Sequence, residues 1–271
     1  MRMEISSSSC KIHKSKNSYQ KNIDLAKISF IVKSKFRKTT KRRFLGYVWL
    51  VLDPFIISMI YLFVFSVVKA NPSASSILLG VTLYRVFQAS IIGGTRCLNN
   101  LNGGFKAERV STKIVILSEL AYRVIDVFLQ TVLIFTILVL AFGMGFFDGL
   151  IFLVIAQLMG LLFFGFGVSI SPLLQKVPDF QNVISYGLRL GFYVSPAMYP
   201  MERMEGFHYH FNQFNPFAYF AELSRHLAGI DSVFFDLDLR LFIAFLSCLL
   251  LVTFIGFRRV DSLRWRMTTW S

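Results

Sequence analysis

The chain has few of the residues from which catalytic and metal sites are built. Its 271 residues include 3 cysteines and 4 histidines, and only 15 acidic residues against 29 basic ones. The cysteines lie far apart, without metal-ligand spacing or an even-numbered framework, so we interpret them as packing residues. His208 and His210 stand two residues apart with only Glu202 and Glu205 nearby, which makes a poor metal site. Neither a Ser-His-Asp set nor a carboxylate pair is visible, which disfavours a membrane-embedded glycosyltransferase.

The sequence also lacks two short signals. The first 20 residues contain no apolar run of the kind that a signal peptide needs, so we expect no such peptide. The phosphate-binding pattern G-x-x-x-x-G-K-[ST] does not occur, because Gly103-Gly104 and the Phe105-Lys106 that follow have the wrong spacing. We therefore predict that the chain is not itself an ATPase or another enzyme and that it holds no cofactor of its own.

Apolar sequence, in contrast, is abundant. Hydrophobic residues make up 55% of the chain and charged residues 16%, with 30 phenylalanines and a mean hydropathy of +0.58. A soluble domain averages about 45–50% apolar and about 25% charged residues, so this balance favours a lipid environment. The net charge of +14 arises largely from lysines and arginines before the first apolar run and after the last. That distribution indicates positively charged cytoplasmic ends rather than a nucleic-acid partner.

Apolar runs of about 17 residues or more are long enough to cross a bilayer as helices. Six such runs are placed at 47–68, 76–97, 113–142, 150–174, 180–199 and 239–257. An even number of spans puts both termini on one side, and the basic loops at 98–112 and 175–179 fall on that side as well. The sequence therefore predicts an all-α integral membrane protein with six transmembrane helices and cytoplasmic termini.

Two segments do not fit a simple span. Residues 23–38 place Ile28, Val32 and Phe36 on one helix face among lysines, which predicts an amphipathic helix on the inner membrane surface. Residues 198–238 are aromatic and interrupted by prolines, and we expect a pair of short re-entrant or interfacial helices there. The predicted organisation is a basic cytoplasmic tail (1–22), an amphipathic interfacial helix (23–44), a transmembrane domain (45–259) and a cytoplasmic C-terminal tail (260–271).

Asp53 and Pro54 interrupt the first predicted span shortly after its basic start. Proline is well accommodated in the first turn of a helix, and aspartate caps the free N–H groups there. We therefore predict that a helix restarts or kinks at these two residues. They would then form a hinge between the interfacial helix and the first span.

Three stretches of the chain carry a resemblance to a known family. They are "RRFLGYVWLVLDPFIISMIYLFVF" at 42–65, "FYVSPAMYP" at 192–200 and "NPFAYFAELSRHLAG" at 215–229. In this order, on a chain with six predicted spans, they resemble the membrane subunit of ABC-2 type polysaccharide exporters. That family exports capsular polysaccharide, O-antigen or teichoic acid. The residues of the third stretch resemble those of the capsule exporters more than those of the other members. The alternative is an ABC-2 permease for a lipid or a drug.

The resemblance implies a half-transporter in the bacterial inner membrane. Two copies of this subunit would form a channel, and two copies of a separate ATP-binding subunit would bind ATP and Mg and hydrolyse the nucleotide. Cytoplasmic elements at 23–38, 99–111 and 175–179 match those that contact this partner in the family. Candidate contact residues are Lys27, Lys35, Glu108, Arg109, Lys176 and Asp179, and solvated surface charges are the alternative interpretation for each.

Two arginines lie inside predicted spans. Arg85 is near the middle of the second span, and Arg189 is midway along the fifth. An ion in the hydrocarbon costs at least about 2.5–3.5 kcal/mol, so both residues are functional candidates. One interpretation is a basic lining for an acidic polymer. The other is an internal ion pair with Glu119 or Asp126, although Arg123 on the same helix face can neutralise those carboxylates.

Aromatic side chains are the remaining feature that suits this class of substrate. The faces of sugar rings pack against aromatic rings, so an aromatic-lined path would hold a polysaccharide through many weak contacts. The lining candidates are Tyr47, Trp49, Phe55, Tyr61, Phe192, Tyr193, Tyr199 and Tyr219. For each of them, core packing or a place at the lipid interface is the alternative. We expect Tyr199 and Tyr219 near the channel exit.

Overall fold

The structure is a computed structural model, which describes residues 23–38, 48–68, 73–98, 111–230, 232–234 and 237–267. Within these residues all regular structure is helical, which confirms the all-α prediction. The elements are a helix at 23–38, α2 (Val48–Val68), α3 (Ala74–Arg96), α4 (Thr112–Phe142), α5 (Phe146–Lys176), α6 (Phe180–Val194), η3 (Met201–Arg203), α7 (Gly206–Gln213), α8 (Pro216–Leu227) and α9 (Leu239–Met267).

Four of the described helices are long and apolar enough to cross a membrane. They are α3, α4, α5 and the Leu239–Arg258 part of α9. The predicted fifth span, in contrast, is wrong in its extent, because α6 has 15 residues and ends at Val194. At a rise of 1.5 Å per residue, such a helix covers about 22 Å of a hydrocarbon core about 30 Å thick. Ser195 is extended (φ −81°, ψ 162°), since the residue before a proline disfavours the helical conformation.

Helix α2 contains the two residues at which the sequence predicts a restart or a kink. It continues without interruption from Val48 to Val68, so Asp53 and Pro54 lie in its second turn and no helix begins there. Of the two predicted alternatives, a restart or a kink, the continuous helix therefore leaves the kink. Pro54 has no N–H group to bond the carbonyl four residues earlier, which permits a kink, and that kink stays a prediction.

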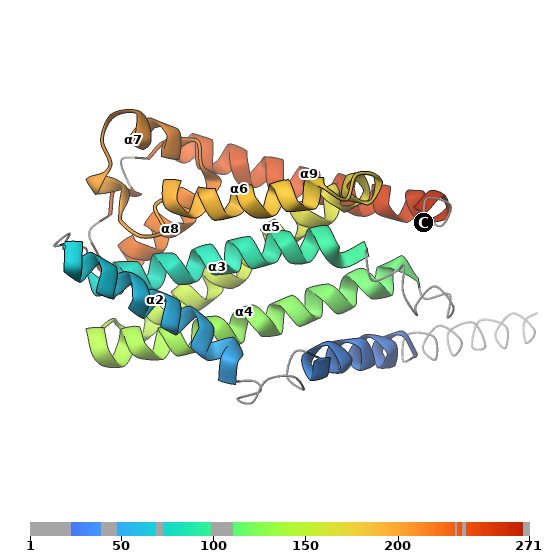
Figure 1. The fold of residues 1–271 in the computed structure, drawn as a ribbon, viewed down its shortest axis with the longest axis horizontal. Helices are drawn as coiled ribbons and strands as arrows, with labels where there is room; N and C mark the ends of the chain where they lie inside the picture. The colour runs from blue at the N-terminus through green and yellow to red at the C-terminus, as the bar shows by residue number, and fades with distance from the viewer. Residues whose placement is uncertain are drawn as a thin grey trace, which may run out of the picture.

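Helix α5 lies at the centre of the bundle and packs against α3, α4 and α9 (Figure 1). Gly94 of α3 meets the backbone of α5 at Phe164 and Val168, and a Cβ at this glycine would overlap that backbone. On the other side of α5, the Ser169 hydroxyl donates a hydrogen bond to the Val252 carbonyl of α9 at 2.9 Å. Small residues at both contacts let the backbones approach closely, as is common between membrane helices.

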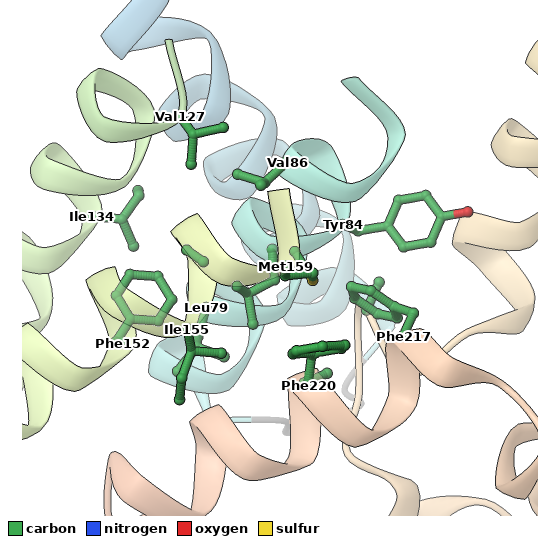
Figure 2. Packing of buried hydrophobic residues seen from close by; sticks show 14 of the residues in the cluster. Leu79, Tyr84, Val86, Val127, Ile134, Phe152, Ile155, Met159, Phe217 and Phe220 are labelled. Atoms are coloured by element: carbon green, nitrogen blue, oxygen red, sulfur yellow. The ribbon is translucent and has the colours of Figure 1, made fainter. Parts of the chain in front are cut away.

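The largest apolar cluster fills the space between α3, α4, α5 and α8 (Figure 2). Its labelled members are Leu79, Tyr84, Val86, Val127, Ile134, Phe152, Ile155, Met159, Phe217 and Phe220. The short helix α8 therefore inserts its apolar side into the bundle instead of lying on its surface. This placement brings the polar side chains of α8 into the interior as well.

The two ends of the bundle differ in charge. The helix at 23–38, the start of α4 and the end of α9 lie toward one end, whereas α7 and α8 lie toward the other (Figure 1). The ends of α3 and α5 lie toward this first end as well, and we call it the basic end (Figure 1). The described cations on these helix ends and on the helix at 23–38 are Lys27, Lys33, Lys35, Arg37, Lys38, Arg96, Lys113, Lys176 and Arg258. Such a concentration is typical of the cytoplasmic side of a membrane protein.

Candidate functional site

The segment before α9 begins with a well-defined helix start. The side chain of Asn215 accepts a hydrogen bond from the Phe217 backbone N–H at 3.1 Å, and Pro216 occupies the first helical position of α8. An asparagine cap followed by proline is a favourable helix N-terminus, because the side chain satisfies a free donor and proline has none to lose. The Asn-Pro pair in the third signature stretch is thus a structural start signal.

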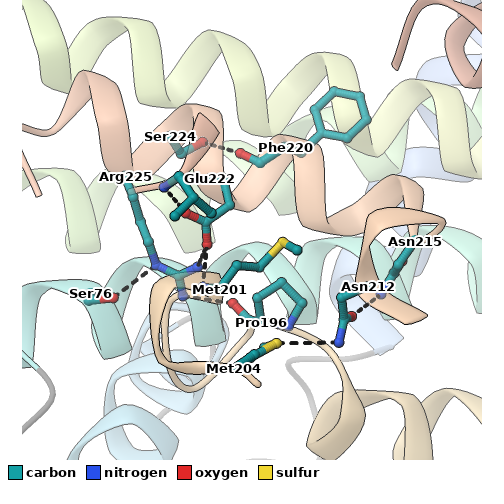
Figure 3. Close-up of polar contacts among 11 residues, drawn as sticks. Ser76, Pro196, Met201, Met204, Asn212, Asn215, Phe220, Glu222, Ser224 and Arg225 are labelled. Atoms are coloured by element: carbon teal, nitrogen blue, oxygen red, sulfur yellow. Dashed lines mark hydrogen bonds and ion pairs between the residues drawn. The ribbon is translucent and has the colours of Figure 1, made fainter. Parts of the chain in front are cut away.

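A buried ion pair follows on the same helix. Arg225 Nη1 donates to Glu222 Oε1 at 2.8 Å, and both side chains are 0% exposed. The other guanidinium nitrogens also have partners, since Nε donates to Ser76 Oγ at 2.8 Å and Nη2 donates to the Pro196 carbonyl at 2.7 Å. Burial lowers the pKa of Arg225, and the Glu222 carboxylate opposes that shift. Figure 3 shows how Arg225 joins α8 to the start of α3 and to the turn after α6.

The carboxylate side of this pair reaches two further segments. Glu222 Oε1 accepts a hydrogen bond from the Met201 backbone N–H at 3.0 Å, and Oε2 accepts one from the Val233 N–H at 3.3 Å. Gly80 supplies the necessary space, because a Cβ there would overlap the Ala197 carbonyl oxygen and crowd Arg225. The pair therefore holds five separate pieces of chain together at the end opposite to the basic end. We call Glu222, Arg225 and their partners the α8 network.

Hydrogen bonds connect the C-terminal end of α6 to α7. Asn212 Nδ2 donates to the Val194 carbonyl at 2.8 Å, and the His208 ring lies 2.6 Å from the same oxygen through Nε2. His210 instead contacts Gln213. The two histidines thus have separate structural partners, and within the described residues no group of three possible metal ligands gathers.

A second polar cluster joins the helix at 23–38 to α4. Lys35 forms an ion pair with Glu119, and Arg123 Nη1 donates to Asp126 Oδ2 at 2.7 Å. The Lys35 ammonium also lies 5.3 Å from the centre of the Tyr122 ring. Burial, with the nearby charge of Arg123, lowers the pKa of Lys35 to about 8, and the Glu119 carboxylate favours the charged form.

This cluster shows which cations pair with Glu119 and Asp126, the two carboxylates considered above as partners of Arg85 and Arg189. Arg123 neutralises Asp126, as the sequence allowed, but Glu119 pairs with a lysine from another helix. Arg189 has no ion pair in the part of the chain that the structure describes, and its guanidinium lies 5.6 Å from the centre of the Tyr186 ring. Arg85 is half-buried on α3.

The exposed face of α6 carries several of the predicted lining residues. Tyr186 is 66% exposed and Tyr193 is 60% exposed, and Arg189 lies exposed between them. Behind this face, Phe192 packs against Tyr61 of α2 with ring centres 5.2 Å apart. Helix α6 therefore presents an aromatic and basic face away from the bundle.

Tyr84 tethers α6 to α3. Its hydroxyl donates to the Leu188 carbonyl at 2.6 Å, and its ring lies 5.1 Å from that of Phe192. Because Tyr84 is buried, it fixes the rotation of α6 and hence the direction of its exposed face. No pattern in the sequence singles out this tyrosine.

The remaining predicted lining residues are dispersed. Trp49 and Phe55 are half-buried on α2, and Tyr199 is half-buried with its hydroxyl donating to the Tyr193 carbonyl at 3.3 Å. Tyr219 is 1% exposed and stacks on Phe242 with ring centres 5.3 Å apart. This packing removes Tyr219 from our candidates, since a core side chain cannot contact a polymer. Tyr47 and the side chains of Asp53 and Pro54 lie outside the described part of the chain.

The predicted partner-contact residues are divided between surface and interior. Lys27, Lys176 and Asp179 are exposed, whereas Lys35 is partly buried in its pair with Glu119. Glu108 and Arg109 lie outside the described residues. The contact of these six residues with an ATP-binding subunit stays a prediction.

The residues that the sequence analysis missed are Glu222, Arg225 and Ser76. One signal was available, because a glutamate and an arginine three positions apart after an Asn-Pro start fall on one face of a short helix. No sequence signal marked Ser76, which lies 149 residues before Arg225.

The family model described as ABC-2 type transporter matches residues 26–228, which is about three quarters of the chain. The chain belongs to the ABC-2 type transporter family. This ABC-2 protein is therefore the multi-pass transmembrane permease subunit of an ABC exporter, and the family implies pairing with an ATP-binding ABC subunit. A search among curated proteins found no match.

The family match extends from the helix at 23–38 to the end of α8. It thus includes the Lys35–Glu119 cluster of this ABC-2 permease, the exposed face of α6 and all of the α8 network except Val233. The elements that carry the Lys35–Glu119 pair extend toward the basic end, and α8 with its network lies at the opposite end (Figure 1).

Proposed function

We propose that this ABC-2 permease subunit forms a homodimeric channel that exports a polysaccharide across the bacterial inner membrane. Two copies of a separate ATP-binding subunit bind ATP and Mg and supply the driving force. In this proposal both termini are cytoplasmic, and α2 and α6 complete a set of six crossings. The short α6 crosses together with the buried turn at 195–197.

The observation that carries the proposal is the exposed face of α6. Arg189 has no ion pair within the described residues, and it lies midway along an apolar helix with Tyr186 and Tyr193 exposed beside it. A charge that faces lipid costs at least about 2.5–3.5 kcal/mol, so this face fits a water-filled path better than lipid. Aromatic rings interleaved with a cation suit a polymer of sugar rings with acidic groups.

The polymer class follows from the same face. A positive charge in the path favours an acidic polysaccharide, which fits a capsular polymer, and a teichoic acid has the same charge. A neutral O-antigen would use only the aromatic side chains. A permease for a lipid or a drug would have no need for an exposed arginine with tyrosines on either side.

Export of an acidic and of a neutral polysaccharide by intact cells tests this proposal. We expect Arg189→Gln to lower export of the acidic polymer about tenfold, the effect of one lost charge-assisted contact. Export of the neutral polymer should change little, and Arg189→Lys should retain most activity. The matched control is Arg240→Gln, which removes an exposed cation at the start of α9.

Two results would contradict the proposal. If both polymers lose export equally and the protein becomes less abundant, Arg189 is structural. If neither polymer is exported while a lipid or drug is, the substrate class is wrong. Co-purification with an ATP-hydrolysing subunit, and the copy number in that complex, test the assembly separately.

A further inference from the structure

A groove opens between α4 and α9 at the basic end. It encloses a cavity of about 370 Å³, within the range of small-molecule sites. The lining residues are Lys113, Ile116, Leu117, Phe254, Phe257 and Arg258. On each helix the cation lies one turn or less nearer the basic end than the apolar residues, so the groove has an apolar interior and a basic rim.

The packing of α9 explains why this groove exists. Gly165 and Gly256 let α9 approach α5 closely, because a Cβ at either position would overlap Thr253 or Ser169. Helix α9 is thereby held against α5 and makes few contacts with α4. Ile116 and Phe257 close the floor of the groove as part of an apolar cluster between α3, α4 and α5.

The walls and the rim of the groove have opposite character. Leu117 and Phe254 form walls that are about half exposed. At the rim, the guanidinium carbon of Arg258 lies 4.3 Å from the centre of the Phe254 ring, which holds the cation close to the groove. Lys113 is in the first turn of α4, where the helix dipole adds to its positive potential. None of the lining residues is acidic.

We propose that this groove binds an anionic phospholipid of the adjacent leaflet. One acyl chain packs between Leu117 and Phe254, and the headgroup phosphate lies between Lys113 and Arg258. The apolar walls disfavour a free phosphate ion, and two cations at headgroup depth favour an anionic over a zwitterionic lipid. Such a lipid fills the space that the packing of α9 on α5 leaves beside α4. It thereby stabilises the spacing of α4 and α9 at the basic end.

Lipid binding to the full-length purified protein tests this site. Phosphatidylglycerol and phosphatidylcholine with identical acyl chains are titrated, and bound lipid is counted by native mass spectrometry. We expect one site that prefers phosphatidylglycerol, and about 25-fold weaker binding of this lipid to the Lys113→Ala/Arg258→Ala variant. Each lost cation accounts for about fivefold, and phosphatidylcholine binding should be unchanged.

Two further variants keep the proposal falsifiable. Leu117→Trp keeps both charges but fills the groove, and it should weaken phosphatidylglycerol binding to a similar degree. The matched control Arg96→Ala/Lys27→Ala removes two exposed cations of the basic end that do not line the groove. Its affinity should change by less than about twofold.

Three results would overturn the proposal. An equal loss in the control would mean general attraction of anionic lipid to a basic surface. Full affinity in Leu117→Trp would mean that no acyl chain lies in the groove. Displacement of phosphatidylglycerol by an equal concentration of glycerol phosphate would mean a site for a free phosphate group.

Discussion

The Glu222–Arg225 pair is the residue-scale feature on which much of the end of this permease opposite to the basic end depends. Two charges with 0% exposure are stable only because each has several hydrogen-bond partners. Arg225 contacts Ser76 and Pro196, while Glu222 contacts the backbone of Met201 and Val233. These hydrogen bonds thus take the place of the water that would otherwise solvate the two charges. They also position segments that have little regular structure.

Removal of one charge of this buried pair should destabilise the protein strongly. We expect Arg225→Met to lower the free energy of unfolding by about 3–5 kcal/mol, because it leaves the Glu222 carboxylate buried without its partner. Thermal unfolding in detergent measures this loss. Arg203→Met, at an exposed position of η3, is the control and should change stability by less than about 0.5 kcal/mol.

The double variant Glu222→Leu/Arg225→Met refines that expectation. It should recover only part of the loss, since the Met201 and Val233 N–H groups then lack their acceptor. If Arg225→Met unfolds no more easily than Arg203→Met, the network has no structural role.

A pair of glycines gives a second residue-scale prediction. Gly80→Ala should destabilise the protein by about 1–3 kcal/mol, because its Cβ would overlap the Ala197 carbonyl and crowd Arg225. Gly187→Ala, on the exposed face of α6 with no atom near its Cβ position, should be neutral or stabilising by up to about 1 kcal/mol. Equal melting temperatures for the two variants would contradict this.

At the scale of elements, the helix at 23–38 is more than a surface anchor. Ile31 packs with Ile114 and Val115 of α4, and Phe36 contacts Tyr122 with ring centres 4.7 Å apart. The Lys35–Glu119 pair adds a charged contact to this apolar interface. A force applied to the helix would therefore be transmitted to α4 directly.

Charge exchange tests this connection between elements. Lys35→Glu should release the helix by placing two carboxylates together, and Lys35→Glu/Glu119→Lys should restore it. The coupling energy should be about 0.5–3 kcal/mol, the range for residues in contact. Hydrogen exchange over 23–38 and ATP-dependent transport are the measurements.

Lys33→Glu reverses an exposed charge on the same helix, at a residue that is not a candidate contact of the ATP-binding subunit, and serves as the control. An equal effect of this variant, or failure of the exchanged pair to restore docking, would show that Lys35 and Glu119 do not couple the two helices.

At the scale of the whole molecule, the main feature is the exposed face of α6 and what surrounds it in the membrane. Helix α3 is mostly buried in the bundle and α5 is about half buried, whereas Tyr186, Arg189 and Tyr193 face away from it. In the proposed dimer this face borders an aqueous path. The apolar outer face of α5 at Leu158 would remain in lipid.

Cysteine labelling distinguishes these surroundings. In a chain whose three native cysteines are replaced by alanine, Tyr193→Cys should react with a water-soluble maleimide about tenfold or more faster than Leu158→Cys. The reason is that the reactive thiolate forms in water and not in hydrocarbon. Equal, slow reaction at both positions would mean that α6 faces lipid or a dry interface.

Much of the architecture was predictable from local sequence. The apolar runs located the helices, the lysines marked the basic end, and Asn215-Pro216 marked the start of α8. Even the early end of α6 has a local cause in Pro196, which the sequence analysis did not use. Arg123 and Asp126 pair as their spacing allowed.

The sequence by itself determined that the described residues form a helical membrane protein with a basic end, because hydropathy, helix propensity and proline geometry act over a few neighbouring residues. Its assignment as a permease comes from the family match. Only the tertiary structure decided that Arg225 meets Ser76, that Lys35 meets Glu119 and that Tyr219 lies in the core. These contacts join segments far apart in the chain. A buried charge requires partners within hydrogen-bond distance, and no local pattern in the sequence specifies which distant segment the folded bundle brings there.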